Sequence, residues 1–411
     1  MQPLILTPTT GDPRAAHAVE AAWRQGRLVG LGAPEDAEAL QHALGLTAPT
    51  QPALPAGPAV VVGSGGSSGR RRWCLQPLSH LRASAAATGQ WLRAQGVEPA
   101  SCLHLNPLPL HHVSGLLPLV RGQEWGAEVR TLPPEWLRHP RELATAVPLE
   151  PGRPVLLSLV PTQLRRFLAD PIALAWLQGC RIVWVGGAPL GTSEAEAARQ
   201  AGLPLAPCYG ATETAAMVCA LPPAQFLAGV AGYGPPLADV QLRLQRPGGA
   251  LEVRCPRLSP GWLQQGRLQP LPQTEGGWWR SGDGAQLEPW GVQILGRLDG
   301  AIHSGGETVF PEVLEARLRR QALAAGLNLQ EVLLLGMADP RWGERLVALV
   351  RPGAGTTAEA LKEQLGRLVQ RWRPAERPRQ WQACPELRAN GQGKWERLRW
   401  RQWLLDKQGQ G

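Results

Sequence analysis

The sequence lacks the cysteine spacing, the long apolar runs and the leader segment that mark several large classes of protein. Its seven cysteines are an odd number and include no CxxC pair, which argues against a zinc site and against a disulfide framework. No segment approaches the roughly 18 consecutive apolar residues needed to cross a bilayer. The first residues carry neither a basic leader nor a long apolar stretch. We therefore expect reduced thiols, no membrane insertion, no signal peptide and a cytoplasmic location.

Long basic runs are also lacking, although the formal net charge is +9. The basic residues are mainly dispersed arginines, and the runs at 70–72 and 371–373 are short. This dispersal predicts no nucleic-acid partner, because a protein that handles anionic nucleotides accounts for the charge equally well. With 411 residues the chain is long enough for two or three domains, which disfavours a single small binding module.

What the sequence does contain is an alternation of apolar strands, loops and helix-like stretches. Buried strands are expected at 59–62, 155–160 and 181–185, and helices at 77–95 and 193–201. From about 231 to 295 the pattern changes to short alternating segments separated by glycine turns, which predicts a small β-subdomain. The whole predicts an α/β fold with a large N-terminal domain of α/β subdomains over 1–297. A small α+β C-terminal domain is expected over 298–411.

A loop of glycine and serine residues follows the expected strand at 59–62. It contains Ser64, Ser67, Ser68 and Gly69 and leads into arginines that end at Arg72. Glycines let backbone N–H groups approach a polyphosphate, serines donate hydrogen bonds and arginines neutralise charge. The loop is not a Walker A motif, because no Gly-Lys-Ser/Thr ends it. We interpret it as a phosphate-binding loop, with a flexible surface loop as the alternative.

The same residues also fit the G-x-S-x-G pattern of serine hydrolases. In that alternative Ser67 attacks an ester, and His111, His112 or His303 acts as the base. Arginines directly after the turn suit a phosphate better than an elbow that leads into a helix. A serine hydrolase is therefore the second functional class.

Residues 209–213 form a compact set of nucleotide-handling groups. Tyr209 offers an aromatic ring for a purine, and Gly210 allows close approach. Thr212 offers a hydroxyl for phosphate, and Glu213 offers a carboxylate for Mg²⁺. A short polar turn between two strands is the alternative. Together with the Gly/Ser loop, the set favours an ATP site.

These motifs, with others in the same order, resemble the acyl-adenylate-forming superfamily of acyl-CoA synthetases, luciferases and peptide-synthetase adenylation domains. The resemblance extends from Ser64 nearly to the C-terminus. It implies ATP and Mg²⁺ as cofactors, CoA as co-substrate, a small carboxylic acid as substrate and a mobile C-terminal domain. In the first half of the chain it implies that Arg72 stands where a lysine is usual and that His112 lies by the acyl pocket. It also implies that Glu213 binds Mg²⁺ and that the adenine is flanked by Gly187, Ala188 and Pro189.

Further motifs of this resemblance lie downstream. They imply that Asp283 and Arg297 hold the ribose and that Asp299 is the hinge. They also imply that Gly305 and Gly306 guide the CoA thiol and that Lys394 bridges the carboxylate and the α-phosphate. Within the superfamily, residues 109–116, 159–164 and 296–307 are most similar to the o-succinylbenzoate:CoA ligases of menaquinone and phylloquinone synthesis. The expected reaction is ATP-dependent ligation of o-succinylbenzoate to CoA through an acyl-adenylate, with another aryl or aliphatic acid as the alternative.

Three features depart from the superfamily pattern. The phosphate loop begins near residue 64, so the region before it is expected to be abbreviated. Arg72 keeps the charge of the usual lysine but changes its geometry, and Gln392 interrupts the motif before Lys394. These departures make a catalytically weakened member a further alternative. We expect either a monomer or a homodimer.

Overall fold

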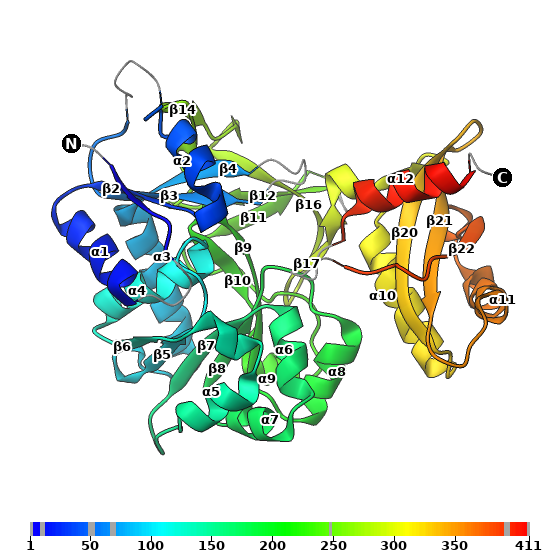
Figure 1. The fold of residues 1–411 in the computed structure, drawn as a ribbon, viewed down its shortest axis with the longest axis horizontal. Coiled ribbons are helices and arrows are strands. Elements are labelled where there is room, and N and C mark those ends of the chain that lie inside the picture. The colour runs from blue at the N-terminus through cyan, green and yellow to red at the C-terminus, as the bar shows by residue number, and fades with distance from the viewer. Residues whose placement is uncertain are drawn as a thin grey trace.

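The computed structural model describes residues 3–8, 13–47, 54–65, 71–245, 249–389 and 395–408. These residues form four β-sheets with helices packed against them, so the expected α/β fold is confirmed. Three of the sheets lie in a larger body, and the fourth lies in a smaller body at the C-terminal end of the chain (Figure 1).

The first sheet carries the Gly/Ser loop. Its strands, in spatial order, are β1 (Leu4–Leu6), β2 (Leu28–Leu31), β3 (Ala59–Ser64), β4 (Arg72–Pro77), β13 (Gly261–Gln264) and β14 (Arg267–Pro270). The first three run parallel, and β4 returns antiparallel to β3 with Arg72 opposite Ser64. The loop therefore closes a hairpin. Strands β13 and β14 come from the region expected to be a separate β-subdomain, but they extend this sheet along β4.

The second sheet is parallel except at one edge. In spatial order its strands are β10 (Ala216–Ala220), β9 (Leu205–Ala211), β8 (Ile182–Val185), β7 (Val155–Leu159), β5 (Leu103–Asn106) and β6 (Glu128–Thr131). Only β10 runs antiparallel to its neighbour. One face is covered by α5 (Pro140–Ala146), α6 (Pro161–Leu168), α7 (Pro171–Gln178), α8 (Thr192–Gln200) and α9 (Pro223–Leu227). The near-continuous apolar strands expected from the sequence are therefore buried on both faces.

Two helices, α3 (Leu78–Ala94) and α4 (Val113–Trp125), lie between the first and second sheets (Figure 1). Leu81 and Leu116 pack into the core of the first sheet, while Trp91 and Trp125 pack into the core of the second. The outer side of the first sheet is covered in part by α2 (Ala37–Ala43), and α1 (Pro13–Arg24) joins the core beside α3. A polar side chain on α4 is consequently shielded from water on two sides.

The third sheet leads to the expected hinge. It contains β11 (Gln241–Leu244), β12 (Ala250–Arg254), β16 (Trp278–Glu288) and β15 (Gln273–Thr274), with β17 (Gly291–Arg297) paired to β16. A short turn, η5 (Leu298–Gly300), follows β17 and contains the predicted hinge residue Asp299. The chain passes through this turn into the fourth sheet.

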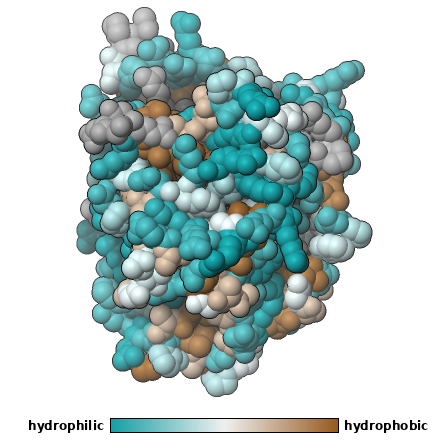
Figure 2. Space-filling view, turned by 90° about the vertical axis from the view of Figure 1, so that its right-hand side faces the viewer, coloured by the Kyte–Doolittle hydropathy of each residue, from teal (hydrophilic) through white to brown (hydrophobic). Residues whose placement is uncertain are grey.

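The fourth sheet forms the C-terminal body. Its strands are β19 (Glu307–Val309), β18 (Ile302–Ser304), β21 (Gly343–Pro352), β20 (Leu329–Asp339) and β22 (Gln380–Ala383), and its helices are α10 (Pro311–Ala324), α11 (Ala358–Leu368) and α12 (Arg397–Gln408). Seen from this end, the surface is mostly hydrophilic, with hydrophobic residues in small separate areas (Figure 2). No helix in the described part of the chain is long and apolar enough to cross a membrane.

A partly buried arginine joins α12 to α10. The two Nη atoms of Arg397 lie 3.0 Å from Glu315 Oε1 and 3.1 Å from Glu312 Oε1. Arg397 also donates a hydrogen bond to the Leu334 carbonyl at 2.7 Å. Any side chain at Gly296, just before the hinge, would overlap the Glu312 carboxylate. The start of α10 therefore contacts both the hinge strand and the last helix.

Candidate active site

The segment after β9 is a strained turn that carries Glu213. It forms the short turn η4 (Thr212–Thr214), after which Ala215 and Ala216 have φ angles of 51° and 78°. L-residues seldom adopt such angles. Ser84 Oγ donates to the Ala215 carbonyl, and Thr214 Oγ1 donates to the Ala216 carbonyl, both at 2.6 Å. Strain that is held by neighbouring contacts is typical of functional sites.

Among the described residues, one side-chain donor orients the Glu213 carboxylate. Glu213 is 8% exposed, and its Oε1 accepts a hydrogen bond from Trp262 Nε1 at 3.0 Å. No group of three or more His, Cys, Asp and Glu side chains within the described residues could hold a metal ion alone. ATP-dependent enzymes usually hold Mg²⁺ by one or two carboxylates, substrate phosphates and water. One oriented carboxylate with a second oxygen left over therefore fits Mg²⁺.

Arg72 lies at the mouth of the β3–β4 hairpin, near Glu213. Its guanidinium stacks over the Trp262 ring, 4.8 Å from the centroid. Ser64 is buried opposite Arg72, whereas Arg71 pairs with Asp36. The predicted phosphate-binding residues Ser67, Ser68 and Gly69 lie outside the described residues. Arg72 of the hairpin and the candidate Mg²⁺ ligand Glu213 therefore both contact the indole of Trp262.

The predicted adenine loop lies beside the strand that carries Tyr209. The loop of Gly187, Ala188 and Pro189 follows β8, and the adjacent strand β9 ends just beyond Tyr209. A Cβ atom at Gly186 would lie 2.8 Å from Cys208 Sγ, so the loop packs closely on β9. A side chain at Gly210 would overlap the Ala216 carbonyl, which explains this glycine. Ligands of open α/β sheets bind beyond the carboxyl ends of the strands.

Tyr209, Asp283 and Arg297 meet although they are far apart in the sequence. The Tyr209 hydroxyl donates to Asp283 Oδ2 at 2.5 Å, and Arg297 Nη1 lies 3.5 Å from Asp283 Oδ1. Asp283 faces Arg297 across the β16–β17 pair, and Gly282, with a φ of 80°, leaves room for the guanidinium. Arg297 also pairs with Asp299 at 3.2 Å. The predicted ribose and hinge residues therefore form one ion-pair network.

The pH dependence of nucleoside binding tests Asp283. Burial raises the pKa of Asp283 above its ordinary value, against the lowering effects of Tyr209 and Arg297. A ribose diol donates hydrogen bonds to a carboxylate, and protonation removes the acceptor. We expect full adenosine affinity above the raised pKa and a loss of up to about tenfold per pH unit below it. Because the pKa is raised, the loss begins at a higher pH than for an ordinary aspartate.

Calorimetric titration with adenosine over a pH series measures this loss. Asp283→Asn should flatten the profile, and so should 2′,3′-dideoxyadenosine in place of adenosine, because each removes one side of the interaction. A profile that keeps its slope in Asp283→Asn would assign the titration to another group.

Arg121, a buried cation on α4, was not predicted from the sequence. Arg121 is 4% exposed, and its Nε has no hydrogen-bond partner within the described residues. Its guanidinium lies 4.9 Å from the Trp184 ring centroid and 5.8 Å from that of Trp125. Burial lowers the pKa of Arg121 to about 10. A buried charge without a counter-ion is costly, so this position is suited to an anionic ligand.

Other unsatisfied polar groups surround this cation. Neither ring nitrogen of the buried His104 has a partner in the described structure, and the same is true of Trp184 Nε1. The rings of His104 and Trp184 lie 5.9 Å apart. Burial holds the pKa of His104 well below its ordinary value, so the ring is neutral near pH 7. Trp184 precedes the adenine loop by a few residues, which places the cluster behind the candidate nucleotide site.

The two histidines of the predicted acyl-pocket motif lie just before α4. His111 is buried, and its ring centroid lies 4.5 Å from that of His112. Burial lowers the pKa of His111, with a smaller contribution from Arg71. His303, the third candidate base of the hydrolase alternative, belongs to β18 in the C-terminal body. The three histidines therefore do not form one cluster.

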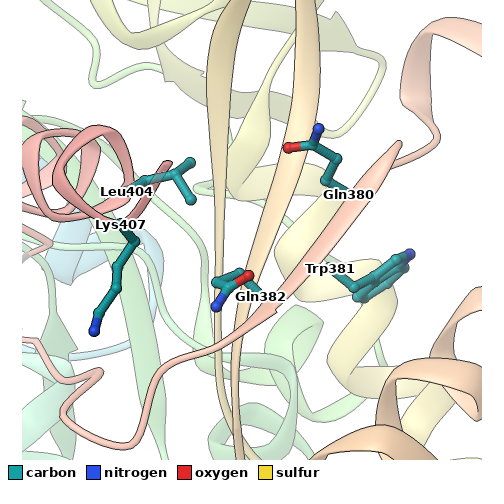
Figure 3. A pocket seen from close by; sticks show the side chains of 5 residues that line it. All are labelled: Gln380, Trp381, Gln382, Leu404 and Lys407. Carbon is teal, nitrogen blue, oxygen red and sulfur yellow. The ribbon is translucent and has the colours of Figure 1, made fainter. Parts of the chain in front are cut away.

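Two predicted features belong to the C-terminal half. Gly305 and Gly306 form the turn between β18 and β19, where the Gly305 N–H donates to the Trp342 carbonyl at 2.9 Å. Lys394 lies outside the described residues. The described residues that line a hollow between β22 and α12 include none of the predicted site residues (Figure 3); they are Gln380, Trp381, Gln382, Leu404 and Lys407.

Comparison with known proteins shows the family to which the chain belongs. A family model described as AMP-binding enzyme matches residues 6–256. A 2-succinylbenzoate–CoA ligase of Enterococcus faecalis (strain ATCC 700802 / V583) is 26% identical over 364 residues, which cover 86% of this chain and 71% of that protein. A probable 2-succinylbenzoate–CoA ligase of Mycobacterium tuberculosis (strain CDC 1551 / Oshkosh) is 31% identical over 325 residues, 76% of each chain. The o-succinylbenzoate CoA synthetase of Bacillus subtilis, solved with its acyl-adenylate intermediate, has a TM-score of 0.72 at 19% identity, over 97% of this chain and 87% of that one.

The structural likeness defines the fold, which is that of the o-succinylbenzoate CoA synthetase of Bacillus subtilis. The sequence matches then place the chain within a family. The chain belongs to the AMP-binding enzyme family. None of the relatives described above is a serine hydrolase, so the alternative that uses Ser67 as a nucleophile gains no support.

Proposed function

We propose that the chain is an AMP-forming acid–thiol ligase that joins o-succinylbenzoate to CoA through an acyl-adenylate, with ATP and Mg²⁺, in the cytoplasm where these co-substrates occur. The buried guanidinium of Arg121, whose Nε has no hydrogen-bond partner among the described residues, carries this choice of acid. o-Succinylbenzoate has two carboxylates, and only one of them is activated. The other remains charged and requires a counter-ion once it leaves water. Arg121, with the polar edges of Trp184 and His104 beside it, supplies one.

In the first half-reaction a carboxylate oxygen attacks the α-phosphorus of ATP, and pyrophosphate leaves. Lys394 bridges the carboxylate and the α-phosphate, while His112 borders the acyl pocket. Mg²⁺ bound at Glu213 neutralises phosphate charge. Asp283 and Arg297 hold the ribose, so the reacting atoms are positioned before they react. The remaining contacts are to the leaving pyrophosphate, from Ser64, Ser67, Ser68, Gly69 and Arg72, and to the adenine and α-phosphate, from Gly187, Ala188, Pro189, Tyr209, Gly210 and Thr212.

In the second half-reaction the sulfur of CoA attacks the acyl carbonyl, and AMP leaves. The domain boundary proposed at 297/298 allows the C-terminal domain to rotate about Asp299, a hinge motion at the end of a strand. The rotation withdraws Lys394 and brings the Gly305–Gly306 turn to the site. The Arg297–Asp299 ion pair, which joins the ribose site to the hinge, supports this arrangement.

An ATP/pyrophosphate exchange assay across a panel of acids, with and without CoA, tests the proposed function. We expect exchange with o-succinylbenzoate, weak exchange with benzoate and aliphatic monocarboxylates, and a thioester product only when CoA is present. Exchange with a different acid alone would reassign the substrate. Absence of exchange with every acid would reject adenylation.

Replacing Gly305 by leucine should separate the two half-reactions. Gly305 has a φ of 60°, and a side chain there would overlap the ring of Trp342. The turn must then shift, and a displacement of about 1 Å can slow a reaction by about 100-fold. We expect pyrophosphate release to change less than about twofold and thioester formation to fall by about tenfold or more, measured separately by single-turnover kinetics.

Gly355→Leu is the matched control for this change. Gly355 has a φ of 80°, and a side chain there would meet open space in a turn before α11. Gly355→Leu therefore causes a similar backbone strain but does not affect the Gly305–Gly306 turn. Equal loss of both half-reactions in Gly305→Leu would contradict the two-conformation mechanism.

A further inference from the structure

We infer that Trp262 is a positioning residue that couples the Mg²⁺ carboxylate Glu213 to the phosphate-loop cation Arg72. Its indole N–H donates to Glu213 Oε1 at 3.0 Å, and the Arg72 guanidinium lies over its ring, 4.8 Å from the centroid. The inference rests on the proposed roles of these two neighbours. Trp262 itself contacts neither the acid nor the nucleotide in the proposed mechanism.

The position of Trp262 is fixed by strand pairing. Trp262 lies opposite Cys74 of β4, and Arg72 is two residues from Cys74 on the same face of that strand. Diagonal neighbours across an antiparallel pair are within reach of aromatic and long side chains. Each neighbour of Trp262 thus comes from a different segment, and only the addition of β13 to the first sheet brings the indole between them.

The segment before Trp262 is also bound to the backbone of the strained turn. The Ser259 N–H donates to the Glu213 carbonyl at 2.7 Å, and Ser259 Oγ donates to the Leu75 carbonyl at 2.7 Å. The side chain and the main chain of Glu213 are therefore held by one short stretch of sequence. A change in this stretch acts on Glu213 directly.

The two contacts act on different parts of the phosphate site. The indole N–H occupies one carboxylate oxygen of Glu213 and leaves Oε2 for a cation, so it fixes which oxygen faces the metal. The indole face limits the rotamers of Arg72, whose side chain is otherwise exposed. Hydrogen-bonded partners of ligating carboxylates typically contribute about 10- to 100-fold to metal affinity.

Two substitutions separate the contacts, with Mn²⁺ as the probe and α,β-methylene-ATP as the nucleotide. Trp262→Phe keeps the ring and removes the N–H, whereas Trp262→Leu removes both. For Trp262→Phe we expect the Mn²⁺ Kd of the enzyme–nucleotide complex, measured by electron paramagnetic resonance, to rise by about tenfold or more. Metal-free nucleotide binding, measured by calorimetry, should be unchanged in Trp262→Phe and weakened in Trp262→Leu.

Trp278→Phe is the matched control. Like Trp262, Trp278 stacks against arginine side chains. Its ring contacts the guanidinium groups of Arg243 and Arg254, and it belongs to the third sheet. Its replacement should leave the Mn²⁺ Kd within about twofold, with a change in Tm similar to that of Trp262→Phe. An equal loss of Mn²⁺ affinity in Trp278→Phe would mean a general packing effect and would overturn the inference.

Glu213→Gln distinguishes failure of the inference from failure of the proposed site. If Glu213→Gln weakens Mn²⁺ binding while Trp262→Phe leaves it unchanged, Glu213 keeps its role and the coupling through Trp262 is wrong. If neither change affects the Mn²⁺ Kd, Glu213 is not the metal carboxylate. The inference about Trp262 is then rejected together with that assignment.

Discussion

Arg121→Met is expected to stabilise the ligand-free protein and, at the same time, to lower kcat/KM for o-succinylbenzoate by about 100-fold or more. The two effects have opposite signs because, within the part of the chain that the structure describes, Arg121 forms no ion pair, and in the proposed function the acid supplies one. Burial lowers its pKa to about 10, which corresponds to roughly 3 kcal/mol against the charged form. Replacing a buried charge by an apolar side chain of similar length should therefore raise the free energy of unfolding by about 1–3 kcal/mol.

The loss of activity should be specific to the second carboxylate. 4-Oxo-4-phenylbutanoate keeps the aliphatic carboxylate and lacks the one on the ring. The wild-type protein should favour the diacid strongly, and Arg121→Met should accept the two acids at similar rates. Urea unfolding measures the stability, and steady-state kinetics with both acids measures the specificity. A variant that still prefers the diacid would show that Arg121 does not bind the second carboxylate.

Arg257→Met is the control for the effect on stability. Arg257 is buried like Arg121, but it pairs with Asp239 at 2.7 Å and donates to the Met217 carbonyl at 2.9 Å. Its replacement leaves these acceptors unsatisfied, so we expect a loss of about 3 kcal/mol or more. If Arg121→Met destabilised the protein as much as Arg257→Met, Arg121 would be a structural residue.

Lys394→Ala is expected to slow adenylate formation by about 100- to 1,000-fold. In the proposed mechanism its ammonium neutralises charge as the carboxylate attacks the α-phosphorus, and no other residue is assigned to both groups. The second half-reaction takes place after Lys394 has withdrawn. Conversion of a preformed acyl-adenylate by CoA should therefore proceed at close to the wild-type rate. Pyrophosphate release and thioester formation, measured in separate single-turnover experiments, provide the comparison.

Lys407→Ala removes the same charge from the C-terminal domain without touching the site. Lys407 lines the hollow between β22 and α12, and its loss should leave both half-reactions unchanged. Unchanged pyrophosphate release in Lys394→Ala would contradict the proposed role of the lysine. A parallel loss in both half-reactions would indicate that Lys394 does not leave the site between them.

Much of the nucleotide site could be predicted from the sequence because its residues lie in short, ordered motifs. The strands expected at 59–62, 155–160 and 181–185 are β3, β7 and β8, and the helix expected at 77–95 is α3. Tyr209 and Asp283 belong to two of these motifs, and the structure joins them by a hydrogen bond although they are far apart in the sequence. A local pattern suffices for the adenine loop and the Tyr209 segment because they lie at the ends of β8 and β9, and the carboxyl ends of neighbouring parallel strands meet.

Arg121 could not be predicted in this way. Most helices of globular proteins have one face in water, and an arginine is normally placed there. Helix α4 lies between two sheets instead, so Arg121 is buried, whereas Gln123 and Glu124 of the same helix are exposed. Burial here follows from the packing of segments far apart in the chain, which no window of neighbouring residues contains.

Trp262 was missed for a related reason. The alternating pattern over 231–295 predicts strands, but it contains no information about the sheet that each strand joins. Strands β13 and β14 leave the other strands of this region and extend the first sheet through β4. The contact of Trp262 with Glu213 depends entirely on that choice of partner.

The ion pairs of Arg397 with Glu312 and Glu315 also affect the order of events in a catalytic cycle. They join the helix just after Lys394 to the helix just after the Gly305–Gly306 turn. Under the proposed rotation, the lysine and the turn therefore move as one piece, and the arrival of either at the site requires the departure of the other. The thiol is thereby kept from the site until the adenylate exists, so the order of the two half-reactions is set by mechanical exclusion and does not depend on how tightly CoA binds.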